Sequence, residues 1–170
     1  MSRRRLHPRR NSTASRRSVR NGRAKPIVAW HATDRVFDRF DPDRSGLGTH
    51  FGTYRAAAGR KRQIGKFRGP AGEWRVTKYT LRFASALRTD DIGGWDDEPQ
   101  VESMLLRHGI IAPADLHDSR RLSGAAFWSW ARRRLADAGY DAIVYANRVE
   151  DKGRDSYVVW DNGIIETVER

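Results

Sequence analysis

The sequence predicts an α+β domain built on a split, mostly antiparallel sheet with a few short helices. Segments with strand character dominate, and the helical segments are few and short. They also do not alternate as repeated strand-helix-strand units, which argues against a parallel α/β sheet. At 170 residues the chain fits one domain with an extension. We therefore expect a single domain over residues 25–170, preceded by an arm.

The arm, residues 1–24, carries most of the excess charge. It contains nine arginines and no acid, which is +9 of the formal net charge of +12. Its low apolar content cannot offset the entropy of ordering, so we expect it to be disordered. Three roles stay open: a solubilising leader, a nucleic-acid-binding arm, or a targeting address. The sequence pI of about 10.9 predicts attraction to polyanions.

The first half of the domain is predicted to alternate between strands and helical turns. An apolar strand over 27–30 ends at His31, and a helical turn over 36–40 is broken by Asp41-Pro42-Asp43. Glycines then form a tight turn that leads into His50. A helix over 54–63 follows, and residues 74–83 alternate like a strand with a possible bulge.

The second half is predicted to contain two helices and two closing strands. Ser123 is the expected N-cap of the longer helix and Gly139 its end. The expected elements are an acidic loop over 89–97, a helix over 101–108, a connection over 115–122, a helix over 124–138, and strands over 142–145 and 157–160 joined by a polar loop over 147–155.

Several classes of function are excluded or disfavoured by composition and motif. The chain has no cysteine, so disulfides and thiolate metal sites are excluded, and its histidines lack ligand spacing, so we expect no metal. No P-loop, dinucleotide fingerprint or nucleophile elbow occurs. No stretch approaches the length of a membrane span and no export signal is supported, so we expect a cytoplasmic protein and no membrane partner.

Two histidines in small-residue settings are the candidate site. His31 follows an apolar strand and is flanked by Ala32 and Thr33, while His50 lies beside glycines and Phe51. A lone histidine at a strand end is more often structural, but the pair favours a ligand site. An ordinary histidine titrates near pH 6.5, so a charged His50 would repel a cationic ring.

Three motifs in order resemble those of ADP-ribosyltransferases of the diphtheria-toxin and poly(ADP-ribose) polymerase type, and most of all those of phage polyvalent proteins. They are Trp30-His31-Ala32-Thr33, Gly48-Thr49-His50-Phe51-Gly52-Thr53 and Ser156-Tyr157-Val158-Val159-Trp160-Asp161. Residues 139–150 resemble the segment that precedes the last strand in the phage type. The resemblance spans most of residues 27–165 and implies that family's split-sheet fold.

The resemblance implies that NAD is the substrate and assigns its contacts. His31 matches the histidine that binds a ribose hydroxyl, and Ala32 and Thr33 match the residues beside it. His50 stands where the larger family has a stacking tyrosine, with Phe51 beside it. The implied NAD-binding set is His31, Ala32, Thr33, His50, Phe51, Gly52, Thr53 and Ser156, with His31, His50 and Glu150 as catalytic residues.

The catalytic carboxylate is the open point of this assignment. Ser156 occupies the position where the polymerases have glutamate, and serine cannot stabilise an oxocarbenium ion by charge. Glu150 fits the phage pattern, Asp155 is a second candidate, and the absence of any such carboxylate is a third. Asp90 and Asp91 are predicted to end a strand and cap a turn.

The expected function is mono-ADP-ribosylation of a macromolecular acceptor, nucleic acid or protein. Glu150 would promote the loss of nicotinamide, and the basic arm favours a nucleic acid or a nucleic-acid-associated protein as partner. The alternatives are a non-catalytic nucleotide-binding domain, a nucleic-acid-binding module with structural histidines, and an NAD-dependent tRNA 2′-phosphotransferase. Arg132, Arg133 and Arg134 are expected to form a solvated helix face, with phosphate contact as the alternative.

Overall fold

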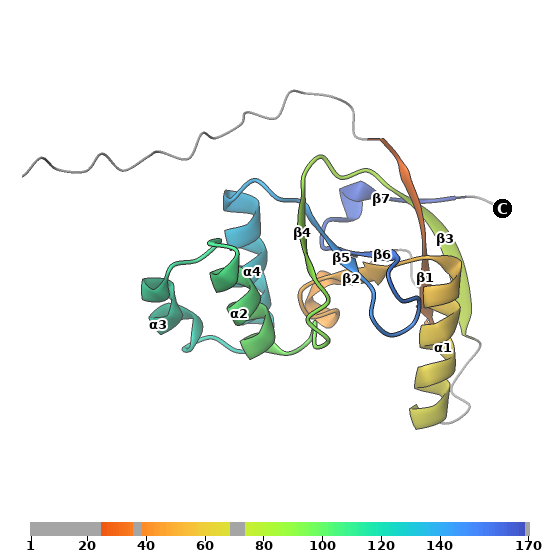
Figure 1. Ribbon diagram of the computed structural model, residues 1–170, viewed down its shortest axis with the longest axis horizontal. Helices are drawn as coiled ribbons and strands as arrows, with labels where there is room; N and C mark the ends of the chain where they lie inside the picture. The colour runs from red at the N-terminus through yellow and green to blue at the C-terminus, as the bar shows by residue number, and fades with distance from the viewer. Residues whose placement is uncertain (1–24, 36–38, 69–73, 169–170) are drawn as a thin grey trace, which may run out of the picture.

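The computed structural model describes residues 25–35, 39–68 and 74–168 (Figure 1). Within them the chain forms two sheets and four α-helices, which confirms the predicted α+β class with a split, mostly antiparallel sheet. The arm over residues 1–24, predicted to be disordered, lies outside the described residues.

The first sheet has three antiparallel strands in the order β1-β3-β7. They are β1 (Ile27–Thr33), β3 (Arg75–Leu81) and β7 (Ile165–Thr167). The β1–β3 register runs without interruption from Ile27 opposite Leu81 to Thr33 opposite Arg75. The prediction of a bulge in the strand over residues 74–83, which corresponds to β3, is therefore wrong.

The second sheet has four strands in the order β2-β6-β5-β4. They are β2 (Thr49–Phe51), β6 (Asp155–Val159), β5 (Ala142–Ala146) and β4 (Ala86–Asp90). β4 and β5 are parallel, and the other pairs are antiparallel. Four consecutive residues of β5 are buried, as expected for a central strand covered on both faces.

A short backbone bridge connects the two sheets. The Trp30 amide donates to the Gly52 carbonyl at 2.8 Å, and the Gly52 amide donates back to the Trp30 carbonyl at 3.0 Å. Beyond this bridge β1 and β2 continue in different sheets. The split therefore begins at the two segments that carry His31 and His50.

The helices lie on two sides of the sheets (Figure 1). α1 (Tyr54–Arg68) packs beside β1, whereas α2 (Glu98–Arg107), α3 (Leu116–Ser119) and α4 (Ala125–Asp137) form a group at the opposite end. Single 3-10 turns lie at Pro42–Arg44, Pro113–Asp115 and Asn162–Ile164.

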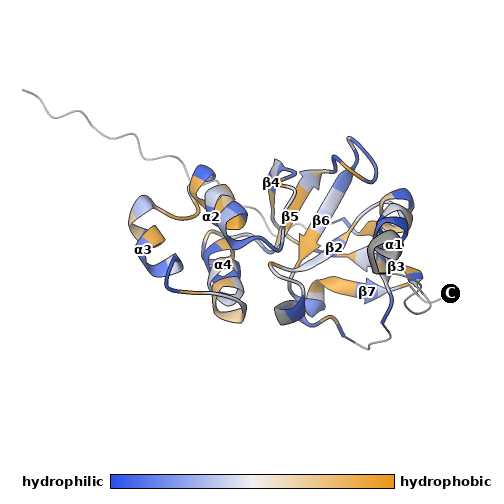
Figure 2. Cartoon of the chain, turned by 90° about the horizontal axis from the view of Figure 1, so that it is seen from below, coloured by the Kyte–Doolittle hydropathy of each residue, from blue (hydrophilic) through white to orange (hydrophobic). Residues whose placement is uncertain are grey.

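Two apolar clusters hold these layers together. The larger lies between the second sheet and helices α2 and α4, and the smaller lies between the sheets around Phe51, Tyr79 and Leu81. Figure 2 shows apolar residues on β5, β6 and β7. Burial of one such side chain contributes roughly 1.5–3 kcal/mol, so the clusters fix how the sheets meet.

Two predicted local features differ or lie outside the described residues. Ser123 does not cap α4; Gly124 is the N-cap with φ of 56°, and its amide donates to the Glu98 carboxylate at 2.6 Å. A glycine suits this left-handed conformation. The predicted turn of helix over 36–40 falls largely on residues 36–38, which are not described. Among the described residues, none of the helices combines the length and apolarity that a bilayer crossing requires.

Candidate functional site

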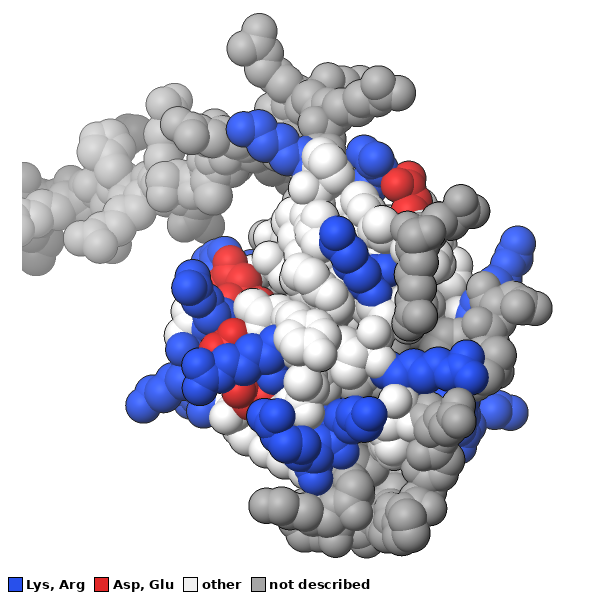
Figure 3. All heavy atoms as spheres, turned by 90° about the vertical axis from the view of Figure 1, so that its right-hand side faces the viewer, with Lys and Arg blue, Asp and Glu red and all other residues white. Residues whose placement is uncertain are grey.

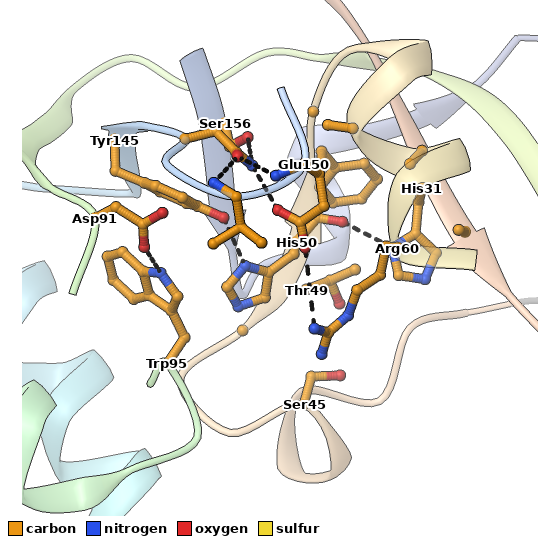
Figure 4. A pocket seen from close by; sticks show the side chains of 18 of the residues that line it. His31, Ser45, Thr49, His50, Arg60, Asp91, Trp95, Tyr145, Glu150 and Ser156 are labelled. Atoms are coloured by element: carbon orange, nitrogen blue, oxygen red, sulfur yellow. Dashed lines mark hydrogen bonds and ion pairs between the residues drawn. The ribbon is translucent and has the colours of Figure 1, made fainter. Parts of the chain in front are cut away.

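A pocket of about 430 Å³ opens where the two sheets separate (Figure 4). β1, β2, α1 and the loops that follow β4 and β5 all contribute to its wall. Of the residues predicted for the site, the pocket is lined by His31, Ala32, His50, Phe51, Gly52, Glu150 and Ser156. The fold therefore brings together segments that lie more than a hundred residues apart in the sequence.

The two histidines are joined by a hydrogen bond across the split. The His31 Nδ1 atom lies 2.7 Å from the His50 carbonyl oxygen. A carbonyl only accepts, so the neutral His31 ring carries its proton on Nδ1 and leaves Nε2 as an acceptor. Burial lowers the pKa of His31, against the opposing effect of the His50 carbonyl. His31 therefore offers an acceptor and no charge at neutral pH.

His50 is held by aromatic side chains from the second sheet and from the loop after β4. Its Nδ1 atom lies 3.2 Å from the Tyr145 hydroxyl, and its ring meets Trp95 edge-on with centroids 5.8 Å apart. Burial, followed by the charge of Arg60, lowers the pKa of His50 to about 4. The pKa of His50 therefore lies below the ordinary histidine value of about 6.5, and its ring is uncharged at neutral pH.

Glu150 places a carboxylate in the same pocket. Its Oε2 atom accepts a hydrogen bond from Asn147 Nδ2 at 3.0 Å, and its Oε1 atom lies 4.0 Å from Arg60 Nη1. The side chain is 15% exposed and lines the pocket. Gly59 makes this approach possible, because a Cβ there would lie 3.1 Å from the Glu150 Cβ.

Asn147 fixes the loop that carries Glu150. Its Oδ1 atom accepts from the backbone amides of Val149, Glu150 and Asp151, at 2.9, 2.9 and 3.1 Å. Its Nδ2 group donates to Glu150 and, at 3.2 Å, to Ser156 Oγ. Asn147 is buried and satisfied at both ends, so it sets the position of the carboxylate.

Asp155 does not supply a carboxylate to the pocket. Its two oxygens accept a bidentate hydrogen bond from Arg88 on the neighbouring strand β4, at 2.8 and 2.9 Å. This partner lowers the pKa of Asp155. Ser156, the next residue, is buried and points the other way, as alternation along a strand requires. Of the two candidates named from the sequence, Glu150 is the one in the pocket.

Three other predicted contacts are placed differently. Thr33 is not among the pocket residues, and its hydroxyl accepts from the Arg35 amide. Phe51 is 2% exposed and packs against Phe40 and Tyr79, so it supports His31 from the core rather than stacking on a ligand. Thr53 accepts from the Ala56 amide, which makes it the cap of α1, and its hydroxyl donates to Asp151.

Several pocket residues outside the predicted set reach the pocket through long-range contacts. Arg60 comes from the alanine-rich helix, and the rings of Tyr145 and Trp95 lie in tilted contact with centroids 4.7 Å apart. Asp91 lines the pocket and caps a turn as predicted, because its Oδ1 atom accepts from the Gly93 amide. It also accepts from Trp95 Nε1 and from the Arg148 amide. The sequence did offer a hint of the role of Asn147, since this polar residue stands only three residues before Glu150.

The donor set suits an organic ligand with both polar and flat parts. The wall combines uncharged imidazoles, an aromatic pair, a carboxylate and a guanidinium, which together provide stacking, hydrogen bonds and charge. Within the part of the chain that the structure describes, no group of three or more His, Asp or Glu side chains is arranged to hold a metal ion.

Comparisons with known proteins give the chain no family. No family model matches the sequence, and no curated protein matches it. A solved structure described as "Crystal structure of an anti-CRISPR protein" aligns over 84% of this chain and 96% of its own, with 9% identity and a TM-score of 0.39. A likeness of that size carries no argument about function.

These findings overturn the assignment to the ADP-ribosyltransferase family. No family model and no curated protein supports membership in that family, and the solved structure reported above is described only as an anti-CRISPR protein. The resemblance rested on three short motifs of four to six residues and one segment of twelve, and the last motif carries Ser156 where glutamate was expected. The family assignment is therefore wrong, and the function rests on the chemistry of the pocket alone.

Proposed function

We propose that the pocket binds NAD, cleaves its nicotinamide–ribose bond and transfers ADP-ribose to a macromolecular acceptor. The observation that carries the proposal is the Glu150 carboxylate, 15% exposed and held by Asn147 in a pocket with two uncharged histidines. A carboxylate beside uncharged histidines suits a reaction in which the ribose acquires positive, oxocarbenium character.

The step begins when the bond between ribose C1′ and the nicotinamide nitrogen breaks. The electron pair leaves with nicotinamide, which becomes neutral, and C1′ acquires oxocarbenium character. The negative charge of Glu150 stabilises that character and orients the ribose hydroxyls. A hydroxyl or amine of the acceptor then bonds to C1′ and releases its proton.

The uncharged histidines accommodate the cationic nicotinamide ring of bound NAD. A protonated His50 would repel the nicotinamide ring of NAD, whereas the neutral ring leaves its face available for contact. His31 Nε2 provides an acceptor for a ribose hydroxyl. Arg60, 60% exposed, has guanidinium donors for a phosphate oxygen of the same substrate.

Nicotinamide release by the purified full-length protein tests the proposal. We expect the isosteric Glu150→Gln substitution to slow release by roughly 10²–10³-fold, the cost of removing one preorganised charge-stabilising group. The matched control is Glu166→Gln on β7, which removes a carboxylate paired with exposed Arg82 and leaves the pocket intact. Equal release by wild type and Glu150→Gln would sink the catalytic proposal.

A binding function without catalysis is the second candidate. The buried Ser156 at the end of the pocket favours it, because its hydroxyl already binds Asn147 and carries no charge. In that case NAD or a related nucleotide binds, and His31→Ala weakens binding, but nicotinamide release does not exceed that of a His31→Ala, Glu150→Gln double variant.

A further inference from the structure

The outer face of helix α1 is a basic surface with an aromatic residue at one end. Residues 54–68 contain six Lys or Arg and no Asp or Glu. Ala56, Ala57 and Gly59 are buried against the sheets, so Tyr54, Lys61 and Arg62, spaced i, i+7 and i+8, share the opposite face. Figure 3 shows this side of the molecule, where basic side chains outnumber acidic ones.

Tyr54 lies where this basic face meets the pocket. Its side chain is 61% exposed, and its ring meets Trp30 edge-on with centroids 6.4 Å apart and an interplanar angle of 82°. Trp30 itself lines the pocket. The contact with Trp30 orients the Tyr54 ring, and the 61% exposure of its side chain leaves it accessible to a flat partner.

The loop between β5 and β6 lies against α1, where Asp151 and Glu150 contact Arg55 and Arg60, and it adds basic side chains beside the helix. Arg148 and Lys152 are exposed there, and Val149 is 63% exposed and lines the pocket. Arg55, 79% exposed, lies 3.8 Å from Asp151, a long contact that leaves guanidinium donors directed to solvent. Basic side chains on α1 and on the adjoining loop favour a polyanion on this surface.

We propose that the outer face of α1 binds a single-stranded nucleic acid, with one unpaired base stacked on Tyr54 and phosphates bound by Arg55, Lys61 and Arg62. Seven residues of helix separate Tyr54 from Lys61, about 10 Å along the axis, so neighbouring nucleotides reach the basic side chains. Stacking on tyrosine needs an exposed base face, which a duplex hides. If the pocket transfers ADP-ribose as proposed above, this surface presents the acceptor nucleotide to it.

The test is fluorescence anisotropy with the full-length protein and no NAD. The probes are labelled single-stranded DNA and RNA of about 12 nucleotides and the matching DNA duplex. We expect Tyr54→Ala to weaken single-strand binding roughly 5- to 150-fold, the value of one stacked base, and to change duplex binding little. Tyr54→Phe retains the ring and should bind like wild type.

The phosphate contacts are tested by the salt dependence of the same binding. Lys61→Gln and Arg62→Gln should each make the slope of log affinity against log salt shallower by about 0.7 for single strands. The matched control is Arg133→Gln, an exposed arginine on α4 at the other end of the molecule. It should leave both affinity and slope unchanged.

Three outcomes overturn the proposal. They are wild-type single-strand affinity in Tyr54→Ala, unchanged salt slopes in Lys61→Gln and Arg62→Gln, and competition by an acidic peptide as effective as competition by the oligonucleotide. Because NAD is absent, these results do not depend on catalysis. A protein that binds single strands through Tyr54 but releases no nicotinamide would refute the proposed function and leave this surface standing.

Discussion

At the scale of single residues, Asn147 controls the site through hydrogen bonds made by both ends of its amide. Three backbone amides and the Glu150 carboxylate depend on it. Asn147→Ala leaves these buried donors unpaired, so we expect a loss of about 2–4 kcal/mol in the free energy of unfolding, measured with urea.

Glu150→Gln provides the contrast to Asn147→Ala. Its amide oxygen still accepts from Asn147, so we expect it to unfold within about 1 kcal/mol of wild type while nicotinamide release falls. If Asn147→Ala were as stable as wild type, the assignment of Asn147 as the residue that fixes this loop would be wrong.

The lowered pKa of His50 leads us to expect that the stability of the folded protein depends on pH. The unfolded histidine binds a proton below about pH 6.5, whereas the folded one does so only near pH 4. The unfolded state therefore binds more protons between these values, and the stability contributed by the neutral ring is lost as the pH falls. The size of the effect is about 3 kcal/mol at most.

Urea unfolding at several pH values between 7 and 4 tests this dependence. His50→Gln should make the fall in stability shallower than in wild type. His117→Gln, at an exposed histidine, should leave the wild-type curve unchanged. Identical curves for wild type and His50→Gln would show that His50 titrates normally in the folded protein.

At the scale of elements, the close approach of Gly48 to strand β6 positions the pocket floor. A Cβ at Gly48 would lie 2.7 Å from the Val159 carbonyl oxygen, which is backbone and cannot move aside freely. We expect Gly48→Ala to cost about 1–3 kcal/mol. At Gly163, a Cβ would meet the flexible Asp161 side chain at 3.3 Å, so Gly163→Ala should cost less in the same urea measurement.

The elements also show how far the sequence predicted the structure. Helices near 54–63, 101–108 and 124–138 and strands near 27–30, 74–83, 142–145 and 157–160 were predicted from periodicity, and all are present with shifted ends. β2 and β7 were missed because three residues carry too little pattern. Most of β4 received no assignment, although Asp90 was predicted to end a strand, because exposed Arg88 and Asp90 interrupt its apolar pattern and its pairing with β5 is long-range.

The same limit applies to the pocket. His31, His50 and Glu150 were predicted as site residues, and the fold places all three along the pocket wall. Arg60, Asp91 and Tyr145 reach the wall through the packing of α1 and the adjacent ends of β4 and β5, which no local pattern reveals. The assigned family was wrong because residue types at short spacing recur without common descent, whereas the geometry of the pocket is a property of this chain.

At the scale of the whole molecule, charge is divided between the arm and the domain. Residues 1–24 hold +9 of the net +12, so a chain without them keeps +3. We expect their deletion to lower the overall affinity for nucleic acid and its salt dependence, because fewer counterions are released. The preference for single strands and the rate of nicotinamide release should remain, since both are assigned to the folded domain.

Anisotropy titrations of the full-length and shortened chains, each against single strand and duplex, measure this division. If the shortened chain no longer prefers single strands, recognition of single-stranded nucleic acid would belong to residues 1–24. Retention of that preference at lower affinity would agree with an arm that attracts polyanions and a domain that discriminates among them.

The central claim is that the pocket breaks NAD and keeps its ADP-ribose half for transfer. The most direct measurement follows two labels in one reaction, one on the nicotinamide and one on the adenine of NAD, with the full-length protein and a single-stranded oligonucleotide. The account predicts that the nicotinamide label is released as free base while the adenine label becomes bound to the macromolecular fraction, and that Glu150→Gln slows both by roughly 10²–10³-fold. Both labels remaining together in intact NAD would contradict it.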